Sequence, residues 1–158
     1  METNVFVKTY EVTWEQLDPL GHLRAPVLLD YVLNSQMSWI TAFGYGQSRL
    51  VSAGYDPVIL KLEARYLHEA LLGETLLDRP QLSGLSPDGS MWKTYHEVVK
   101  RDGEKVATVK LEGTWFNWKT KQALAPEADL LSVLMKVEKT ANFETMRSII
   151  RSSNARSS

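Results

Sequence analysis

Residues 17–40 read LDPLGHLRAPVLLDYVLNSQMSWI. A turn-forming segment with one acid, one histidine, one glycine and two prolines leads directly into a long apolar segment. In the apolar part, large side chains recur at the i, i+3, i+4, i+7 spacing of a helix and also fill neighbouring positions. Pro26 suits a first helical turn, and Gly44 and Gly46 end the pattern. A helix apolar over most of its circumference is typical of one buried on more than one side.

Alternation of apolar and polar residues predicts strands before and after this helix. Residues 4–14 form the first of them. Residues 57–118 are interpreted as four consecutive antiparallel strands, with hairpin signals at PDG (87–89) and DG (102–103). Pro80 places the second of these four strands at an edge or at a bulge, because proline cannot donate to a ladder.

After the strands, the sequence predicts helix again. Pro126 begins a segment with an apolar stripe, and residues 142–151 (NFETMRSIIR) are interpreted as a short last helix. The polar end RSSNARSS is interpreted as disordered. We therefore expect one domain over 1–138 and a C-terminal helical extension with a disordered tail over 139–158.

Composition narrows the classes of function. A chain of 158 residues suits one domain, and its net charge of −1 gives no reason to expect nucleic acid as a partner. It has no cysteine, which excludes disulfides, cysteine nucleophiles and thiolate metal sites. The three histidines lack metal-ligand spacing, so we expect no metal and no cofactor. We see no signal peptide and no membrane span, and we expect a cytoplasmic protein.

The order of elements predicts the fold class. A strand, a long buried helix, four strands and a final helix describe an α+β protein. A long buried helix needs apolar surface nearly all round it, and a five-stranded antiparallel sheet curled about the helix supplies this. This arrangement resembles the hot-dog fold over residues 4–118.

The motif before the helix sharpens the resemblance. Asp18-Pro19-x-Gly21, followed by Pro26, is similar to the 4-hydroxybenzoyl-CoA thioesterase branch of that fold, which has an Asp-x-x-Gly turn between the first strand and the central helix. His22, four residues after Asp18, is similar to the plant-type acyl carrier protein (ACP) thioesterases. The asparagines that follow the histidine in that group are absent here, so the resemblance does not extend to an Asn-based mechanism.

The resemblance implies a thioesterase that hydrolyses an acyl-CoA or acyl-ACP thioester. Asp18 would act as nucleophile or general base, and His22 would orient Asp18, bind the carbonyl or stabilise the leaving thiolate. The N-terminus of the helix offers unpaired backbone N–H groups to an oxyanion; Ala25 is the first candidate, and Gly21 or His22 the second. Arg24 and Arg65 are the predicted substrate-binding residues. The resemblance also implies a homodimer or homotetramer, in which residues 57–66 wall the site of a second subunit.

Each assignment has an alternative. Asp18 is also a good turn residue, His22 an ordinary loop histidine, and Arg65 a member of a solvated strand face. A 3-hydroxyacyl thioester dehydratase and a non-catalytic acyl-thioester-binding protein are the other two functions compatible with the same fold. The tryptophans supply aromatic surface for an acyl pocket or simply for a core: Trp14, Trp39, Trp92, Trp115 and Trp118.

Overall fold

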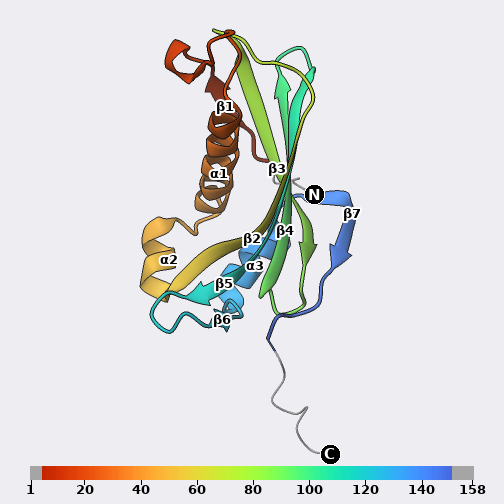
Figure 1. The fold of residues 1–158 in the computed structure, drawn as a ribbon. Helices are drawn as coiled ribbons and strands as arrows, with labels where there is room; N and C mark the ends of the chain where they lie inside the picture. Colours follow the sequence, from red (N-terminus) through yellow and green to blue (C-terminus); the bar gives the residue numbers. More distant parts are fainter. Residues whose placement is uncertain (1–4, 151–158) are drawn as a thin grey trace, which may run out of the picture.

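A computed structural model describes residues 5–150 and is built around one long helix (Figure 1). This helix, α1, spans Ala25–Ala42 and begins with Pro26 in its first turn. Its buried side chains are Val27, Leu28, Tyr31, Val32, Ser35, Trp39 and Ile40. Because these positions repeat at helical spacing, α1 presents one continuous apolar surface to the sheet. The helix predicted from the apolar segment is therefore confirmed.

The sheet follows the spatial order β1-β3-β4-β5-β2, with antiparallel neighbours throughout. Its strands are β1 (Lys8–Glu11), β2 (Tyr55–Tyr66), β3 (Thr75–Leu85), β4 (Met91–Lys100) and β5 (Lys105–Asn117). The sheet curls along α1, which is the hot-dog arrangement, so the predicted α+β fold is confirmed (Figure 1).

The position of β2 corrects the predicted order of strands. The four strands within 57–118 do not pair consecutively, because β2 pairs with β5 and lies at the far edge of the sheet. Only β3, β4 and β5 form a meander joined by hairpins. The longer connection 67–74 makes this possible, since it leads from the edge strand β2 past β5 and β4 to β3 instead of turning tightly.

The first strand is shorter than the predicted 4–14. β1 ends at Glu11, and a short 3-10 helix, η1 (Trp14–Gln16), follows it. Thr13 and Gln16 form a capping box at the start of η1, and this local hydrogen bonding replaces further strand pairing. Residue 4 lies outside the described residues.

The C-terminal part contains one predicted helix and one unexpected strand. The helix α3 (Ala128–Lys136) follows the short strand β6 (Ala123–Leu124), as the segment after Pro126 predicted. Residues 139–145, however, form strand β7 (Lys139–Thr145), which runs parallel to β3. The predicted helical extension over 139–158 is thus wrong for its first part, and residues 146–150 are not helical either. The tail predicted to be disordered, 151–158, lies outside the described residues.

The edge of β3 explains why β7 is a strand. β1 pairs with β3 only as far as Asp78, so the later part of β3 has free backbone groups on that side. The N–H of Leu82 donates to Glu138 O at 2.8 Å, and the N–H of Met146 donates to Leu85 O at 3.0 Å. Pro80 lies between the two paired parts, next to a bulge after Leu82, in agreement with the prediction of an edge or bulge.

The core lies between α1 and the sheet and is closed at one end by α2 (Gln47–Ala53) and α3 (Figure 1). Trp39, Trp92 and Trp115 are almost fully buried there, whereas 77% of Trp14 and 42% of Trp118 are exposed. The three inner tryptophans therefore serve the core. Among residues 5–150, no helix is long and apolar enough to cross a membrane.

Candidate functional site

The turn before α1 is built around the carboxyl group of Asp18. Its Oδ1 accepts hydrogen bonds from the backbone N–H groups of Leu20 and His22, both at 2.9 Å. The Asp18 N–H donates to His22 O at 2.8 Å, and Gly21 takes a φ of 85°, which favours glycine. Asp18 therefore has the structural role of a turn residue, and this role occupies only one of its two carboxyl oxygens.

The other oxygen of Asp18 faces the side chain of His22. Oδ2 lies 3.9 Å from His22 Nδ1, and both side chains are more than one third exposed. The hydrogen bond from the backbone N–H of His22 lowers the pKa of Asp18 the most; desolvation opposes it, and the N–H of Leu20 adds to the lowering, so the pKa lies below its ordinary value. Asp18 is consequently ionised at neutral pH, with a free oxygen directed to the side of the turn where His22 lies.

The N-terminus of α1 has one open backbone donor. Val27 and Leu28 donate to Arg24 O, and Pro26 has no N–H. The N–H groups of Gly21 and His22 are already bound by Asp18. Within the described residues no acceptor pairs with the N–H of Ala25.

Of the predicted donors to an oxyanion, the structure thus leaves Ala25 available and occupies Gly21 and His22. The positive end of the α1 dipole adds to the attraction of Ala25 for a developing negative charge.

The connection between β2 and β3 packs against this turn. The N–H of Leu23 donates to Ala70 O at 2.9 Å, which brings Glu69 next to the turn. Glu69 Oε2 lies 2.9 Å from His22 Nε2. No sequence pattern indicated Glu69, because its contact with His22 joins two segments far apart in the chain: the turn before α1 and the connection between β2 and β3.

An apolar strip of β2 lies beside the same end of α1. The Tyr66 hydroxyl donates to Ala25 O at 3.1 Å, so that this end of β2 reaches the first turn of the helix. Leu62 shares the inner face with Tyr66, and Leu60 lies at the bulge. Of Leu62, 40% is exposed, and of Tyr66, 48%, which is unusual for such residues on the inner face of a sheet. About half of Leu60 is exposed beside them.

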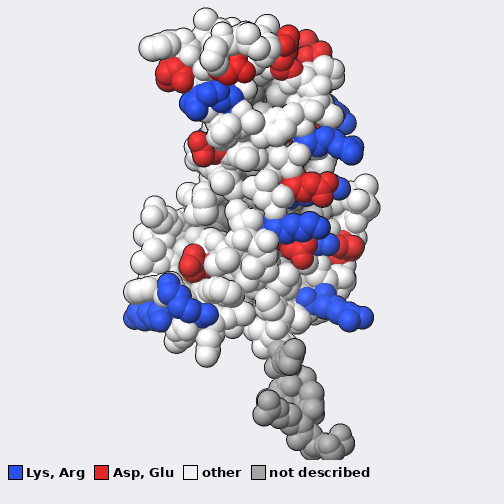
Figure 2. Space-filling model, in the orientation of Figure 1, with Lys and Arg blue, Asp and Glu red and all other residues white. Residues whose placement is uncertain are grey.

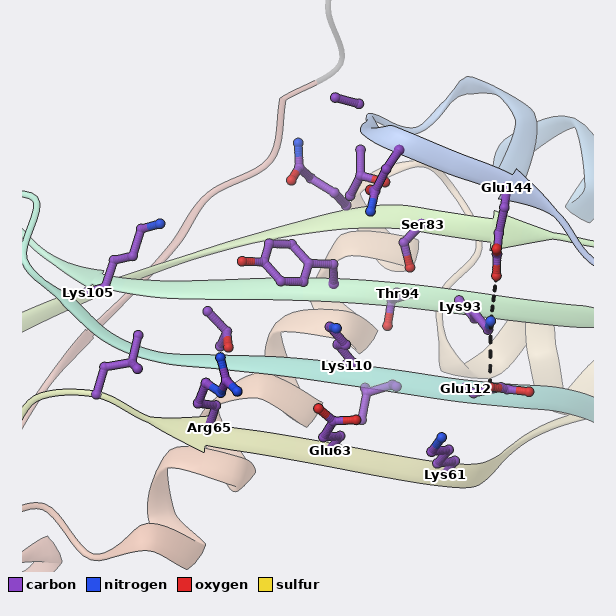
Figure 3. Close-up of a pocket in the computed structure, with 18 residues that line it drawn as sticks. Lys61, Glu63, Arg65, Ser83, Lys93, Thr94, Lys105, Lys110, Glu112 and Glu144 are labelled. Carbon is purple, nitrogen blue, oxygen red and sulfur yellow. Dashed lines mark hydrogen bonds and ion pairs between the residues drawn. The ribbon is translucent and has the colours of Figure 1, made fainter.

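Arg65, by contrast, points away from the Asp18 turn. It lies on the outer face of β2 and lines a groove of about 920 Å³ that crosses the sheet as far as β7 (Figure 3). Lys93 in this groove is held between Glu112 and Glu144, at 4.0 and 2.5 Å. The neighbouring cations Lys61, Arg65 and Lys110 have no acidic partner among the described residues. Arg24, the other predicted binding residue, is exposed at the N-terminus of α1.

Charges of both signs are spread over the molecule. Figure 2 shows acidic side chains at the end that carries the Asp18 turn, and alternating acidic and basic side chains along the rest of that face. A face of mixed sign lacks the continuous positive potential on which binding to a nucleic-acid backbone depends.

Comparison with known proteins supports the fold and gives the family. The sequence matches no functionally curated protein. The solved structure of the hypothetical protein SAV2348 from Staphylococcus aureus, in complex with CoA, is similar with a TM-score of 0.80 and 16% identity, over 89% of this chain and 90% of that one. A 1,4-dihydroxy-2-naphthoyl-CoA thioesterase from Synechocystis gives 0.74 and 11% identity, over 83% and 96%.

A third similar structure is the probable thioesterase YbaW from Escherichia coli, with a TM-score of 0.70, 20% identity, and coverage of 84% of this chain and 98% of that one. Identities this low show a shared fold. A family model, that of the thioesterase-like superfamily, matches residues 12–134, a span that contains the Asp18 turn, α1 and the whole antiparallel sheet from β2 to β5. The chain belongs to the thioesterase-like superfamily.

Proposed function

We propose that this protein hydrolyses acyl-CoA thioesters at the N-terminus of α1. One observation carries the proposal: the ionised carboxyl group of Asp18 lies in the turn that leads directly to the open N–H of Ala25. Thioester hydrolysis needs both kinds of group, one to activate or perform the attack and one to bind the oxyanion.

The chemistry follows from these two groups. The thioester carbonyl oxygen accepts a hydrogen bond from Ala25, and the charge that develops on it is stabilised by the helix dipole. Asp18 then attacks the carbonyl carbon to form an anhydride or takes a proton from an attacking water. Its lowered pKa keeps it ionised in either role. His22 is close enough to Asp18 to assist it and to interact with the leaving thiolate.

The apolar strip of Leu60, Leu62 and Tyr66 supports an acyl or aryl group as the rest of the substrate. Leu62 and Tyr66 share the inner face of β2, and Tyr66 contacts the first turn of α1, so an acyl chain can be buried next to the reacting carbonyl. Burial of such a chain contributes about 0.8 kcal/mol per methylene group.

CoA rather than ACP is the carrier we propose, with Arg24 and Arg65 as contacts to its phosphates. Arg65 lies at the same end of β2 as Tyr66 and lines the groove with Lys61 and Lys110, and none of these three cations has an acidic partner among residues 5–150. Comparing CoA with dephospho-CoA and pantetheine thioesters tests this part. If Arg65→Gln leaves the KM ratios between these three carriers unchanged, Arg65 does not bind the nucleotide.

A homodimer joined through β2 is the assembly we propose. β2 is a twelve-residue edge strand, and a long edge with exposed apolar side chains favours pairing with another chain. Residues 57–66 would then lie at the second subunit's site. Light scattering of the wild type tests this: a monomer at micromolar concentration would contradict it. A cytoplasmic location remains a prediction from the sequence.

To test the activity, the release of free thiol is measured with short-chain, long-chain, branched and aryl CoA esters. Asp18→Asn keeps an oxygen to accept the N–H groups of Leu20 and His22, so its turn stays folded while its charge is lost. We expect the wild type to release thiol and the variant to lose at least about 10²-fold in kcat. Asp30→Asn, on the exposed face of α1, is the matched control. If Asp18→Asn keeps the wild-type rate, Asp18 is not the catalytic carboxylate.

The same panel separates the other two functions. A 3-hydroxyacyl-CoA that yields an enoyl product without thiol release would indicate a dehydratase. Tight binding of acyl-CoA without turnover by the wild type would indicate a binding protein.

A further inference from the structure

Among residues 5–150, Glu69 is the one acidic side chain that contacts His22 from outside its own turn. We propose that Glu69 is a positioning residue of the α1 site, which fixes the ring of His22 so that Nδ1 faces Asp18 as a proton acceptor. The inference rests on the proposed hydrolysis of a thioester at this site and assigns the proton transfer within it.

The backbone around Glu69 is held on both sides. Ala70, its neighbour, is 2% exposed and accepts a hydrogen bond from Leu23, the residue after His22. Further along the connection, Gly73 donates to Val12 O at 2.9 Å. An exposed ion pair between flexible side chains contributes little, because ordering both of them costs entropy. Here both backbones are already fixed relative to each other, so the contact has a defined geometry at a smaller entropic cost.

The distance between Glu69 and His22 decides which ring nitrogen carries the proton. An ionised carboxylate only accepts hydrogen bonds, so a ring nitrogen 2.9 Å from Glu69 Oε2 is favourable when it is protonated. In the neutral imidazole the proton is therefore on Nε2, and Nδ1 has a free lone pair. Nδ1 lies 3.9 Å from Asp18 Oδ2, which is too long for a direct hydrogen bond and suitable for a water that contacts both atoms.

This geometry assigns each proton in the hydrolysis. In the general-base route, the water gives one proton to Asp18 Oδ2 while the water oxygen bonds to the thioester carbon, and Asp18 passes this proton on to His22 Nδ1. The carbonyl becomes an oxyanion on the N–H of Ala25. When the carbon–sulfur bond breaks, the proton on Nδ1 passes to the thiolate, and the acid and the thiol leave. Glu69 stabilises the imidazolium that exists between these two steps, as the carboxylate of a nucleophile–base–carboxylate triad does.

Four variants test the assignment: Glu69→Ala, Glu69→Gln, His22→Gln and the double variant Glu69→Ala/His22→Gln. We expect Glu69→Ala to lower kcat about ten- to hundredfold without a change in KM, because Glu69 does not touch the substrate. Glu69→Gln, which keeps an acceptor oxygen, should restore part of the loss. In the His22→Gln background, Glu69→Ala should have no further effect, since it acts only through His22. Glu11→Gln, at an exposed position on β1, is the control.

A spectroscopic measurement tests the tautomer without activity. Nitrogen-15 NMR of the ring should show His22 protonated on Nε2 in the wild type and a mixture of tautomers in Glu69→Ala. An unchanged tautomer, or a kcat of Glu69→Ala equal to that of the wild type, overturns the inference and leaves the proposed function intact. A wild type that releases no thiol from any ester overturns the proposed function itself.

Discussion

The ring of His96 faces the carboxyl group of Asp78 across two neighbouring strands, with Nδ1 2.9 Å from Oδ2, and neither side chain is exposed to solvent. On its other side, His96 Nε2 lies 3.0 Å from Oε1 of Gln36, an α1 residue to which Thr94 also donates. These contacts connect the middle of α1 to β3 and β4 through polar groups inside an apolar core. They hold the helix in a fixed position along the sheet.

Asp78→Ala should destabilise the fold strongly without touching the α1 site. It leaves His96 buried without its acceptor, and removing one partner of a buried pair costs about 3–5 kcal/mol. Urea unfolding measures the loss, with Asp30→Ala on the exposed face of α1 as the control, expected to stay within about 0.5 kcal/mol. Equal stabilities of the two variants would show that the buried pair does not stabilise the fold.

Gly113→Ala tests the packing beneath the aromatic core. A Cβ at this position would lie 2.2 Å from the ring of Trp92 and 2.5 Å from Val58 O, so either the indole or the backbone of β2 has to move. Overpacking of this kind costs about 1–3 kcal/mol or more. Gly46→Ala, where the nearest atom lies at an ordinary 3.4 Å from the new Cβ, is the comparison in the same unfolding experiment. A loss no greater than that of Gly46→Ala would contradict the close contact.

The lowered pKa of Asp88 makes the free energy of unfolding depend on pH in the acid range. Burial alone would raise its pKa, but hydrogen bonds from Ser148, Ser86 and Ser90 outweigh this and lower the pKa to about 2. Because the folded pKa lies below the unfolded value of about 3.9, Asp88 stabilises the fold above that pH. The stabilisation is lost as the pH falls to about 2.

Unfolding free energies measured between about pH 5 and pH 2 should therefore fall less steeply for Asp88→Asn than for the wild type. The difference should be about 1 kcal/mol once screening by solvent is allowed for. Ser148→Ala, which removes one donor, should show part of the same change. Parallel pH profiles for the wild type and Asp88→Asn would exclude a role for these hydrogen bonds.

Local patterns predicted the parts of the molecule that local forces determine. The turn at Asp18 and the helix after it follow from proline, glycine and apolar spacing, and both are found where they were expected. The position of β2 at the far edge was not predictable in this way. Whether β2 pairs with β5 or with β3 depends on contacts between segments far apart in the chain. For the same reason local patterns predict a helix where β7 is found, since the pairing of β7 depends on the free edge of β3.

Polar residues in buried strands are a sequence signal for a buried pair. Asp78 shares the inner face of β3 with Leu76, and His96 shares that of β4 with Val98. A charged residue in such a position needs a partner, which would have suggested a buried pair. Glu69 gave no comparable signal, because its contact with His22 depends on how two connections pack.

Ala25→Pro tests the backbone donor directly. Proline at this position removes the open N–H and little else, because the preceding residue, Arg24, already has the extended conformation that a following proline requires, with φ −68° and ψ 137°. If the Ala25 N–H binds the oxyanion, kcat should fall about 10²–10³-fold, as it does when one such donor is lost, while the melting temperature changes little. Pro26→Ala, which adds an N–H in the same turn, is the matched control and should keep its activity. A fully active Ala25→Pro would move the oxyanion away from the N-terminus of α1, and the proposed roles of Asp18 and His22 would then need a different position for the thioester.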